Sequence, residues 1–135
     1  SVAMLCGPGG NITLVPCKQR LSDDGRLRYL GGELPLAAGL ADRAAALAER
    51  ALAALPATVG YLGIDLVLGR DPHGSEDAVI EVNPRLTTSY VGLRTAAQSN
   101  LAEAMWRIAQ GETPSVSFAE RPLEFDPAGN VSFMR

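Results

Sequence analysis

Short apolar runs separated by turn-forming residues make up the first 30 positions of the chain. Residues 1–6 and 12–18 flank Gly-Pro-Gly-Gly-Asn, and residues 19–21 and 26–30 flank Ser-Asp-Asp-Gly. Glycine and asparagine accept the positive φ angle of a tight reversal, whereas proline and aspartate favour the start of a turn. The pattern therefore predicts two β-hairpins in succession.

Two later stretches show the spacing of three and four residues that marks one face of a helix. In residues 40–55 the apolar positions share a face and the charged positions lie elsewhere, until Pro56 ends the pattern. A second apolar face runs through residues 101–109, and the capping residue before it is either Thr95 or Asn100. Both helices are predicted to pack on a sheet.

A third hairpin is predicted where residues 61–69 and 77–83 flank a loop that contains Asp-Pro and His-Gly pairs. Residues 113–135 alternate apolar and polar positions around Pro-Ala-Gly, which indicates edge strands or an extended tail. Hairpins combined with two packing helices predict the α+β class, with a mostly antiparallel sheet.

The size and composition of the chain are those of one folded domain. Its 135 residues are 47% hydrophobic and 20% charged, which is enough to bury a core. The net charge of −3 and the scattered arginines argue against a nucleic-acid surface, which needs clustered cations. The sequence contains neither an apolar run of roughly 20 residues nor a signal peptide. We therefore expect a cytoplasmic protein, free of the membrane, in which Cys6 and Cys17 are reduced, buried thiols.

The predicted strand that ends at Asn83 carries a row of polar side chains. Residues two apart in a strand share a face. Glu81, Asn83 and Arg85 therefore project one way, while Ile80 and Val82 are expected to project into the core. Charged groups beside a core need partners, so the row marks a candidate site.

The hairpin geometry places a second carboxylate opposite the first. If the turn is centred near His73, antiparallel pairing sets Asp65 across from Glu81. Opposed like charges destabilise a sheet, so a cation is expected between them. The two carboxylates and the Asn83 carbonyl are oxygen ligands of the kind that Mg²⁺ prefers, together with the phosphates of a nucleotide. The pattern predicts a metal and nucleotide site, with Mn²⁺ as an alternative ion.

Residues beyond this strand add groups that bind anions. Arg85 carries a planar fork that grips phosphate or carboxylate oxygens at two points. Pro84 stops the strand ladder, and a hydroxyl-rich loop that holds an anion or a substrate carboxyl group is predicted at Thr87, Thr88 and Ser89.

Each of these features has an alternative explanation. Asp65 and Glu81 also fit a solvated face with Arg85 as their ion-pair partner, and such surface pairs are common and weak. Lys18, Gln19 and Arg20 form either a basic wall of the site, in which Lys18 and Arg20 contact substrate, or part of an ordinary edge strand.

Two segments resemble a known family. GYLGIDLVLG (residues 60–69) and DAVIEVNPRLTTSYVGL (residues 77–93) are similar to the C-terminal half of ATP-grasp ligases. In that family an acidic residue on one strand and a Glu-x-Asn pair on the next bind the magnesium ions of ATP. The run NPRLTTSY looks most like the carboxylate–amine ligases of the tyramine–glutamate ligase subgroup, and SVAMLC resembles the strand that opens the second half of their ATP-grasp domain.

The resemblance implies that Asp65, Glu81 and Asn83 are metal ligands. It implies that Glu81, Asn83 and Arg85 bind ATP, and that Arg85 is also catalytic because it contacts the phosphates or an acyl phosphate. The implied reaction is ATP-dependent phosphorylation of a substrate carboxylate, followed by attack of an amine to form an amide bond. Residues 87–89 would lie near the acceptor substrate.

The resemblance also implies what the chain lacks. Residues 1–112 would be the C-terminal ATP-grasp lobe, and residues 113–135 the edge strands or tail. Family members carry an earlier subdomain whose lysines hold the α and β phosphates, whereas Lys18 is the only lysine here. Gly63 stands where D-alanine–D-alanine ligases carry a substrate-binding arginine.

We therefore expect this chain to be one lobe of a larger enzyme and to be inactive alone. Its partners would be the missing N-terminal lobe and small-molecule carboxylate and amine substrates, and a homo-oligomer is left open. Two alternatives stand beside this prediction. One is a non-catalytic binding or assembly domain that keeps the fold, and the other is a carboxylating ATP-grasp enzyme.

Overall fold

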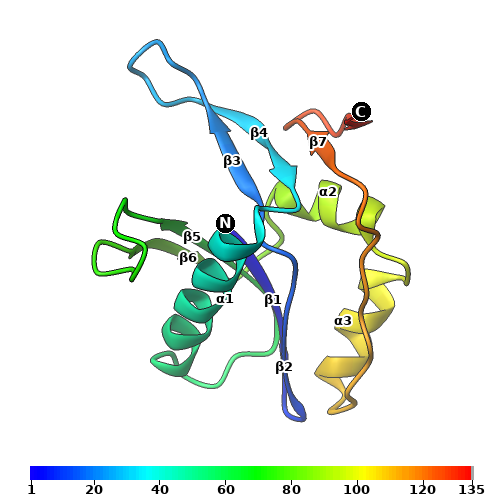
Figure 1. Cartoon of the computed structure of the whole chain (residues 1–135). Helices are drawn as coiled ribbons and strands as arrows, with labels where there is room; N and C mark the ends of the chain where they lie inside the picture. The colour runs from blue at the N-terminus through cyan, green and yellow to red at the C-terminus, as the bar shows by residue number, and fades with distance from the viewer. Residues whose placement is uncertain (135) are drawn as a thin grey trace.

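The computed structural model describes residues 1–134, which form two four-stranded antiparallel sheets and three helices (Figure 1). The first sheet has the order β2-β1-β5-β6, with bounds Gly10–Thr13, Val2–Gly7, Gly60–Val67 and Ala78–Asn83. The second has the order β3-β4-β7-β8, with bounds Lys18–Leu21, Tyr29–Leu34, Leu123–Phe125 and Val131–Phe133. The helices are α1 (Ala38–Ala53), α2 (Ser89–Ala96) and α3 (Leu101–Ala109). No helix among the described residues combines the length and the apolar character needed to cross a membrane.

The predicted α+β class is confirmed, although the strands divide between two sheets and a third helix is present. The division occurs at residues 14–17. The strand predicted over residues 12–18 stops at Thr13, and β3 begins at Lys18. Pro16 lies between them and lacks the N–H group that a continuous ladder would need. The chain leaves the first sheet here and opens the second.

One face of the first sheet packs on α1. Alternate residues of β1 and β5, such as Val2, Leu62 and Ile64, are turned toward the helix and fully buried. The helix contributes Ala44 and Ala48 to this core, and their small side chains let it lie close to the sheet. The apolar spacing predicted this helix over residues 40–55, and in the structure it begins and ends two residues earlier.

The opposite face of the first sheet contributes to a second core, which also includes α2, α3 and the second sheet. Its fully buried side chains include Leu34, Leu93, Ile108, Leu123 and Phe125. Strand β7 lies inside the second sheet, between β4 and β8. The segment after residue 112 therefore forms strands, but of these only β8 is an edge strand, because β7 is an inner strand and part of the core. A domain boundary at residue 112 stays a prediction.

Helix α3 begins where one of the two expected capping residues lies. The side-chain oxygen of Asn100 accepts hydrogen bonds from the backbone N–H groups of Ala102 and Glu103, at 2.9 and 3.2 Å. These bonds satisfy donors that have no partner within the helix. Thr95, the other candidate, lies inside α2.

Helix α2 is the element that the sequence analysis missed. Its buried residues Gly92, Leu93 and Ala96 follow helical spacing, but a glycine inside a helix weakens its propensity. Close packing against another element explains this glycine, because a Cβ atom at residue 92 would lie 2.4 Å from Cδ1 of Phe125. The helix therefore packs directly against β7, which lies above it in Figure 1.

The register between β5 and β6 confirms the predicted pairing of Asp65 with Glu81. One expectation about this hairpin was wrong: Ile80 does not enter the core and is 65% exposed. The next pair is Leu66 with Val79, so Ile80 is the extra residue of a β-bulge. The bulge breaks the strict alternation of side chains. Val79 and Val82, three residues apart, consequently both pack on the α1 side.

Candidate functional site

A cavity of about 250 Å³ lies between the first sheet and the hairpin formed by β3 and β4. Its walls come from both sheets and from the segment that leads into α2. The lining residues are Ser1, Gln19, Leu21, Tyr29, Asp65, Glu81, Asn83, Arg85, Thr87, Thr88 and Ser89. Asp65, Glu81, Asn83, Arg85 and the three hydroxyl residues, which were predicted from the sequence, are thus brought together.

Two carboxylates and an amide, from β5 and β6, line this cavity, and Glu81 is exposed. Asp65 pairs with Glu81, and Asn83 pairs with Gly63 two residues further along the same two strands. Asn83 is only 7% exposed, and its side chain has no hydrogen-bond partner among the described residues. No lysine, arginine or histidine in that part of the chain makes an ion pair with Asp65 or Glu81. The solvated-face explanation named Arg85 as their ion-pair partner. Arg85 pairs with neither carboxylate, whereas the exposure of Glu81 fits that explanation.

Arg85 lies at the rim of the cavity and is exposed. Its side chain donates only one hydrogen bond, to the backbone oxygen of Leu86 at 3.2 Å. The guanidinium fork therefore retains most of its donors for another acceptor. The first turn of α2 is directed at the same cavity, and the partial positive charge of a helix N-terminus favours anions.

The predicted hydroxyl-rich loop is, in the structure, the start of α2. Thr88 is its N-cap and Ser89 its first residue. The hydroxyl groups of Thr87 and Ser89 lie 2.9 Å apart, and each lies 3.3 Å from the phenol oxygen of Tyr61. Burial raises the pKa of Tyr61, so its phenol stays neutral and can donate a hydrogen bond.

Gly63 explains how these hydroxyl groups reach the sheet. A Cβ atom at residue 63 would lie 2.4 Å from Cγ2 of Thr87, so Thr87 fills the space above the glycine. A larger residue, such as the arginine of D-alanine–D-alanine ligases, could not occupy this position unless Thr87 moved.

Lys18 and Arg20 do not line the cavity. Both belong to β3 and face away from it, toward carboxylates of neighbouring strands. Lys18 is 3.4 Å from Glu33, and Arg20 pairs with Glu124. The structure therefore favours the edge-strand alternative for these two residues, and a contact with substrate stays a prediction.

Ser1, Leu21 and Tyr29 are the cavity residues that the sequence analysis missed, and it considered Gln19 only as part of a basic wall or an edge strand. Gln19 alternates with Lys18 and Arg20 and therefore faces the opposite way, and its Nε2 atom donates a hydrogen bond of 2.9 Å to Oδ1 of Asp65. Burial raises the pKa of Tyr29 to about 12, with smaller effects from nearby charges. The alternation of β3 indicates that Gln19 faces the other side, but no local signal shows that β3 crosses above Asp65.

The side-chain oxygen atoms of Asp65, Glu81 and Asn83 fit a hard divalent cation. Among the described residues, no group of three or more histidine, cysteine or acidic side chains is arranged to hold a metal ion. Two carboxylates and an amide carbonyl match the partial coordination sphere of Mg²⁺, which substrate phosphates and water usually complete. Asp65, Glu81 and Asn83 are the residues that would hold it.

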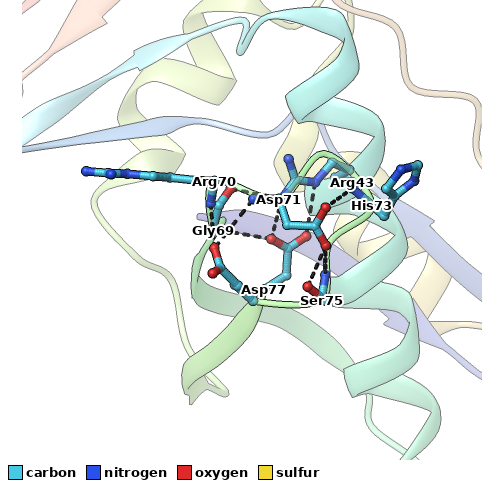
Figure 2. A network of polar contacts seen from close by, with 8 residues as sticks. Arg43, Gly69, Arg70, Asp71, His73, Ser75 and Asp77 are labelled. Carbon is cyan, nitrogen blue, oxygen red and sulfur yellow. Dashed lines mark hydrogen bonds and ion pairs between the residues drawn. The ribbon is translucent and has the colours of Figure 1, made fainter.

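A second group of carboxylates, which we call the loop cluster, lies in the loop of the same hairpin and consists of Asp71, Glu76 and Asp77. Figure 2 shows Asp71 and Asp77 of this cluster together with Arg43. The guanidinium of Arg43 pairs with Asp77, whose Oδ1 also accepts the N–H of Gly69 at 2.9 Å. Asp71 accepts two backbone N–H groups and a serine hydroxyl, and Glu76 accepts two further N–H groups. Every carboxylate of the loop cluster is therefore already partnered.

A larger cavity, of about 660 Å³, lies on the α1 side of the first sheet. Its walls are mostly apolar, and its one carboxylate, Glu49, already accepts a hydrogen bond of 2.9 Å from Thr13. Volume alone does not make a site. The smaller cavity holds the carboxylates, the amide and the free guanidinium, so it is the candidate active site.

The fold and the cavity together define a class of protein. The sequence model of the ATP-grasp domain matches residues 1–89, and the chain belongs to the ATP-grasp family. Among curated proteins it is similar to tyramine–L-glutamate ligases from Methanocaldococcus fervens and Methanocaldococcus jannaschii, each 32% identical over 84 residues. These matches cover 62% of this chain, and 26% and 25% of the two ligases, respectively. The chain therefore spans about a quarter of the length of these relatives. No solved structure gave a significant match.

Proposed function

We propose that this chain is the metal-binding lobe of an ATP- and Mg²⁺-dependent carboxylate–amine ligase. The enzyme would use ATP to activate a carboxylate as an acyl phosphate, and an amine would then attack to form an amide. The observation that carries this proposal is the opposed pair Asp65 and Glu81, which faces a cavity without an ion-pair partner. Membership of the ATP-grasp family and the similarity to two ligases support it.

The residues of the cavity have distinct roles in this proposal. Asp65, Glu81 and Asn83 would hold Mg²⁺. The ion would neutralise the negative charge that develops on the transferred phosphoryl group. Arg85 binds the phosphate oxygens with its fork and stabilises the same charge. Because phosphoryl transfer requires little covalent chemistry from the protein, positioning and charge stabilisation account for most of its catalysis.

The acceptor end of the cavity is formed by Thr87, Thr88 and Ser89. Their hydroxyl groups, held by Tyr61, offer hydrogen bonds to a carboxyl or phosphoryl oxygen. The neutral phenol and the start of α2 add no negative charge there, so an anionic substrate is not repelled. Glutamate and tyramine, the substrates named for the two relatives, are the first pair to test.

The adenine and the α and β phosphates would be bound by a further ATP-grasp lobe that closes over this one. This lobe would be the partner of the present chain, and the chain alone would be inactive. A cytoplasmic location is part of the same proposal, since the proposed reaction consumes ATP.

The proposal is tested with the complete protein that contains this chain. ADP release would be measured with MgATP and a panel of carboxylates, each with and without an amine. Release that depends on both a carboxylate and an amine supports the ligase. Release that depends on bicarbonate would indicate a carboxylating enzyme, and absence of MgATP binding by calorimetry would indicate a non-catalytic domain.

A further inference from the structure

The two sheets touch through one polar contact at the candidate site. Gln19 on β3 donates from Nε2 to Oδ1 of Asp65 on β5, at 2.9 Å. Among residues 1–134, this is the only side-chain hydrogen bond that joins a strand of one sheet to a strand of the other. Both side chains are partly buried, so water competes weakly for the bond.

The chemistry of the donor matters because the acceptor is a predicted metal ligand. An amide N–H orients a carboxylate without neutralising it. A lysine or arginine at the same place would put a full positive charge beside Asp65 and compete with a divalent cation. Fixing Oδ1 also leaves the second oxygen of Asp65 to the cavity.

Gln19 is a neutral residue that lies between two cationic residues of β3. Its two neighbours, Lys18 and Arg20, are both cationic, and strand alternation turns both to the opposite face of β3. There each meets a carboxylate, Glu33 and Glu124. A shift of one residue in β3 would bring a cation to Asp65.

We infer that Gln19 is a positioning residue for the metal site: it holds Asp65 in the orientation that binds the cation and keeps its charge available. This inference rests on the proposed function, since it assigns Gln19 a role toward the same Mg²⁺. Partners of this kind, which contact a metal ligand and not the metal, typically change metal affinity about 10- to 100-fold when removed.

The test is a Mn²⁺ titration of the complete protein that contains this chain, in which the electron paramagnetic resonance signal reports the free ion. All three metal ligands lie on this chain, so no turnover is needed. Three variants are compared with wild type. Gln19→Met keeps the length of the side chain and removes the donor, Gln19→Lys adds a cation, and Gln110→Lys makes the same substitution at an exposed position at the end of α3.

We expect Gln19→Met to raise the dissociation constant for Mn²⁺ about 10-fold and Gln19→Lys about 100-fold. Gln110→Lys should stay within twofold, and circular dichroism should show that all variants are folded. Wild-type affinity in Gln19→Met would overturn the inference while leaving the metal site in place. Failure of the wild-type protein to bind Mn²⁺ would overturn the metal site and the inference together, whereas the proposed function fails separately, if ADP release does not depend on a carboxylate and an amine.

Discussion

The hairpin of β5 and β6 carries two groups of carboxylates that have opposite environments. The loop cluster of Asp71, Glu76 and Asp77 is satisfied from within the chain, by Arg43, a serine hydroxyl and backbone N–H groups. The pair of Asp65 and Glu81 has one neutral amide donor and, among the described residues, no cation within ion-pair distance. Partnered carboxylates stabilise a loop, whereas opposed and unpaired ones destabilise a sheet. The difference separates carboxylates that maintain structure from carboxylates that are available to a ligand.

Loss of Glu81 should have the largest effect on function and almost none on stability. In the complete enzyme, Glu81→Ala should lower ATP-dependent turnover at least about 1,000-fold, because a metal ligand supplies several kcal/mol of charge stabilisation. The metal-free variant should unfold at the wild-type temperature or slightly above it, since repulsion with Asp65 is removed. Turnover is measured by coupled ADP release and stability by calorimetry.

The matched control is Glu76→Ala, which removes a carboxylate from the loop cluster of the same hairpin. It should keep turnover within a few-fold of wild type. Near-normal turnover of Glu81→Ala, or equal losses in the two variants, would end the distinction between the two groups.

Arg85→Lys should reduce turnover about 100-fold, which is typical for the loss of one donor that stabilises the transition state. The lysine keeps the charge but replaces the fork with a single point, so two phosphate oxygens can no longer be held together. Arg70→Lys, at an exposed arginine that extends away from the loop cluster in Figure 2, should be active. Steady-state rates at saturating MgATP would show whether the two arginines differ in this way.

Arg43→Met should have the opposite effect from Glu81→Ala, because it should lower stability and leave metal binding almost unchanged. Arg43 is the cation that meets Asp77, whose side chain is only 4% exposed, and its removal leaves that carboxylate uncompensated. We expect the melting temperature to fall by several degrees while Mn²⁺ affinity stays within twofold. Unchanged stability would mean that the Arg43 pair contributes nothing to the loop.

Acid should weaken the loop cluster, with a smaller effect than the loss of Arg43. The bond from Arg43 holds the pKa of Asp77 below its ordinary value, and the Ser75 hydroxyl does the same for Asp71. Each aspartate has a lower pKa in the folded protein than in the unfolded chain, where it is about 3.9. Its stabilisation is therefore fully present above the pKa of the unfolded chain and is lost as pH falls through the pKa of the folded protein. Melting temperatures measured from pH 6 to pH 2 should decline less steeply in Asp77→Asn than in wild type.

Local pattern was sufficient for most of the fold. Alternation and turn residues predicted the hairpins, and the turn centre predicted the pairing of Asp65 with Glu81. The bulge at Ile80 was not predictable, because one inserted residue reverses the faces without any change in composition. Helix α2 was missed because Gly92 is explained by contact with Phe125, more than 30 residues later along the chain.

The candidate site was predictable as far as its residues share one hairpin. Asp65, Glu81, Asn83 and Arg85 follow from spacing on β5, β6 and the residues just beyond. Gln19 did not, because its position above Asp65 depends on how the second sheet lies over the first. The roles of these residues in binding metal, nucleotide and substrate stay predictions until they are measured.

The most direct test of the two carboxylate groups is the binding of Mn²⁺ to charge-matched double variants of this chain. Asp65→Asn/Glu81→Gln removes the pair that faces the cavity, and Asp71→Asn/Glu76→Gln removes two carboxylates of the loop cluster. We predict that the first double variant weakens binding at least about 100-fold and that the second stays within twofold of wild type. Retained binding in the first variant, or lost binding in the second, would contradict the assignment of Asp65 and Glu81 as the metal site.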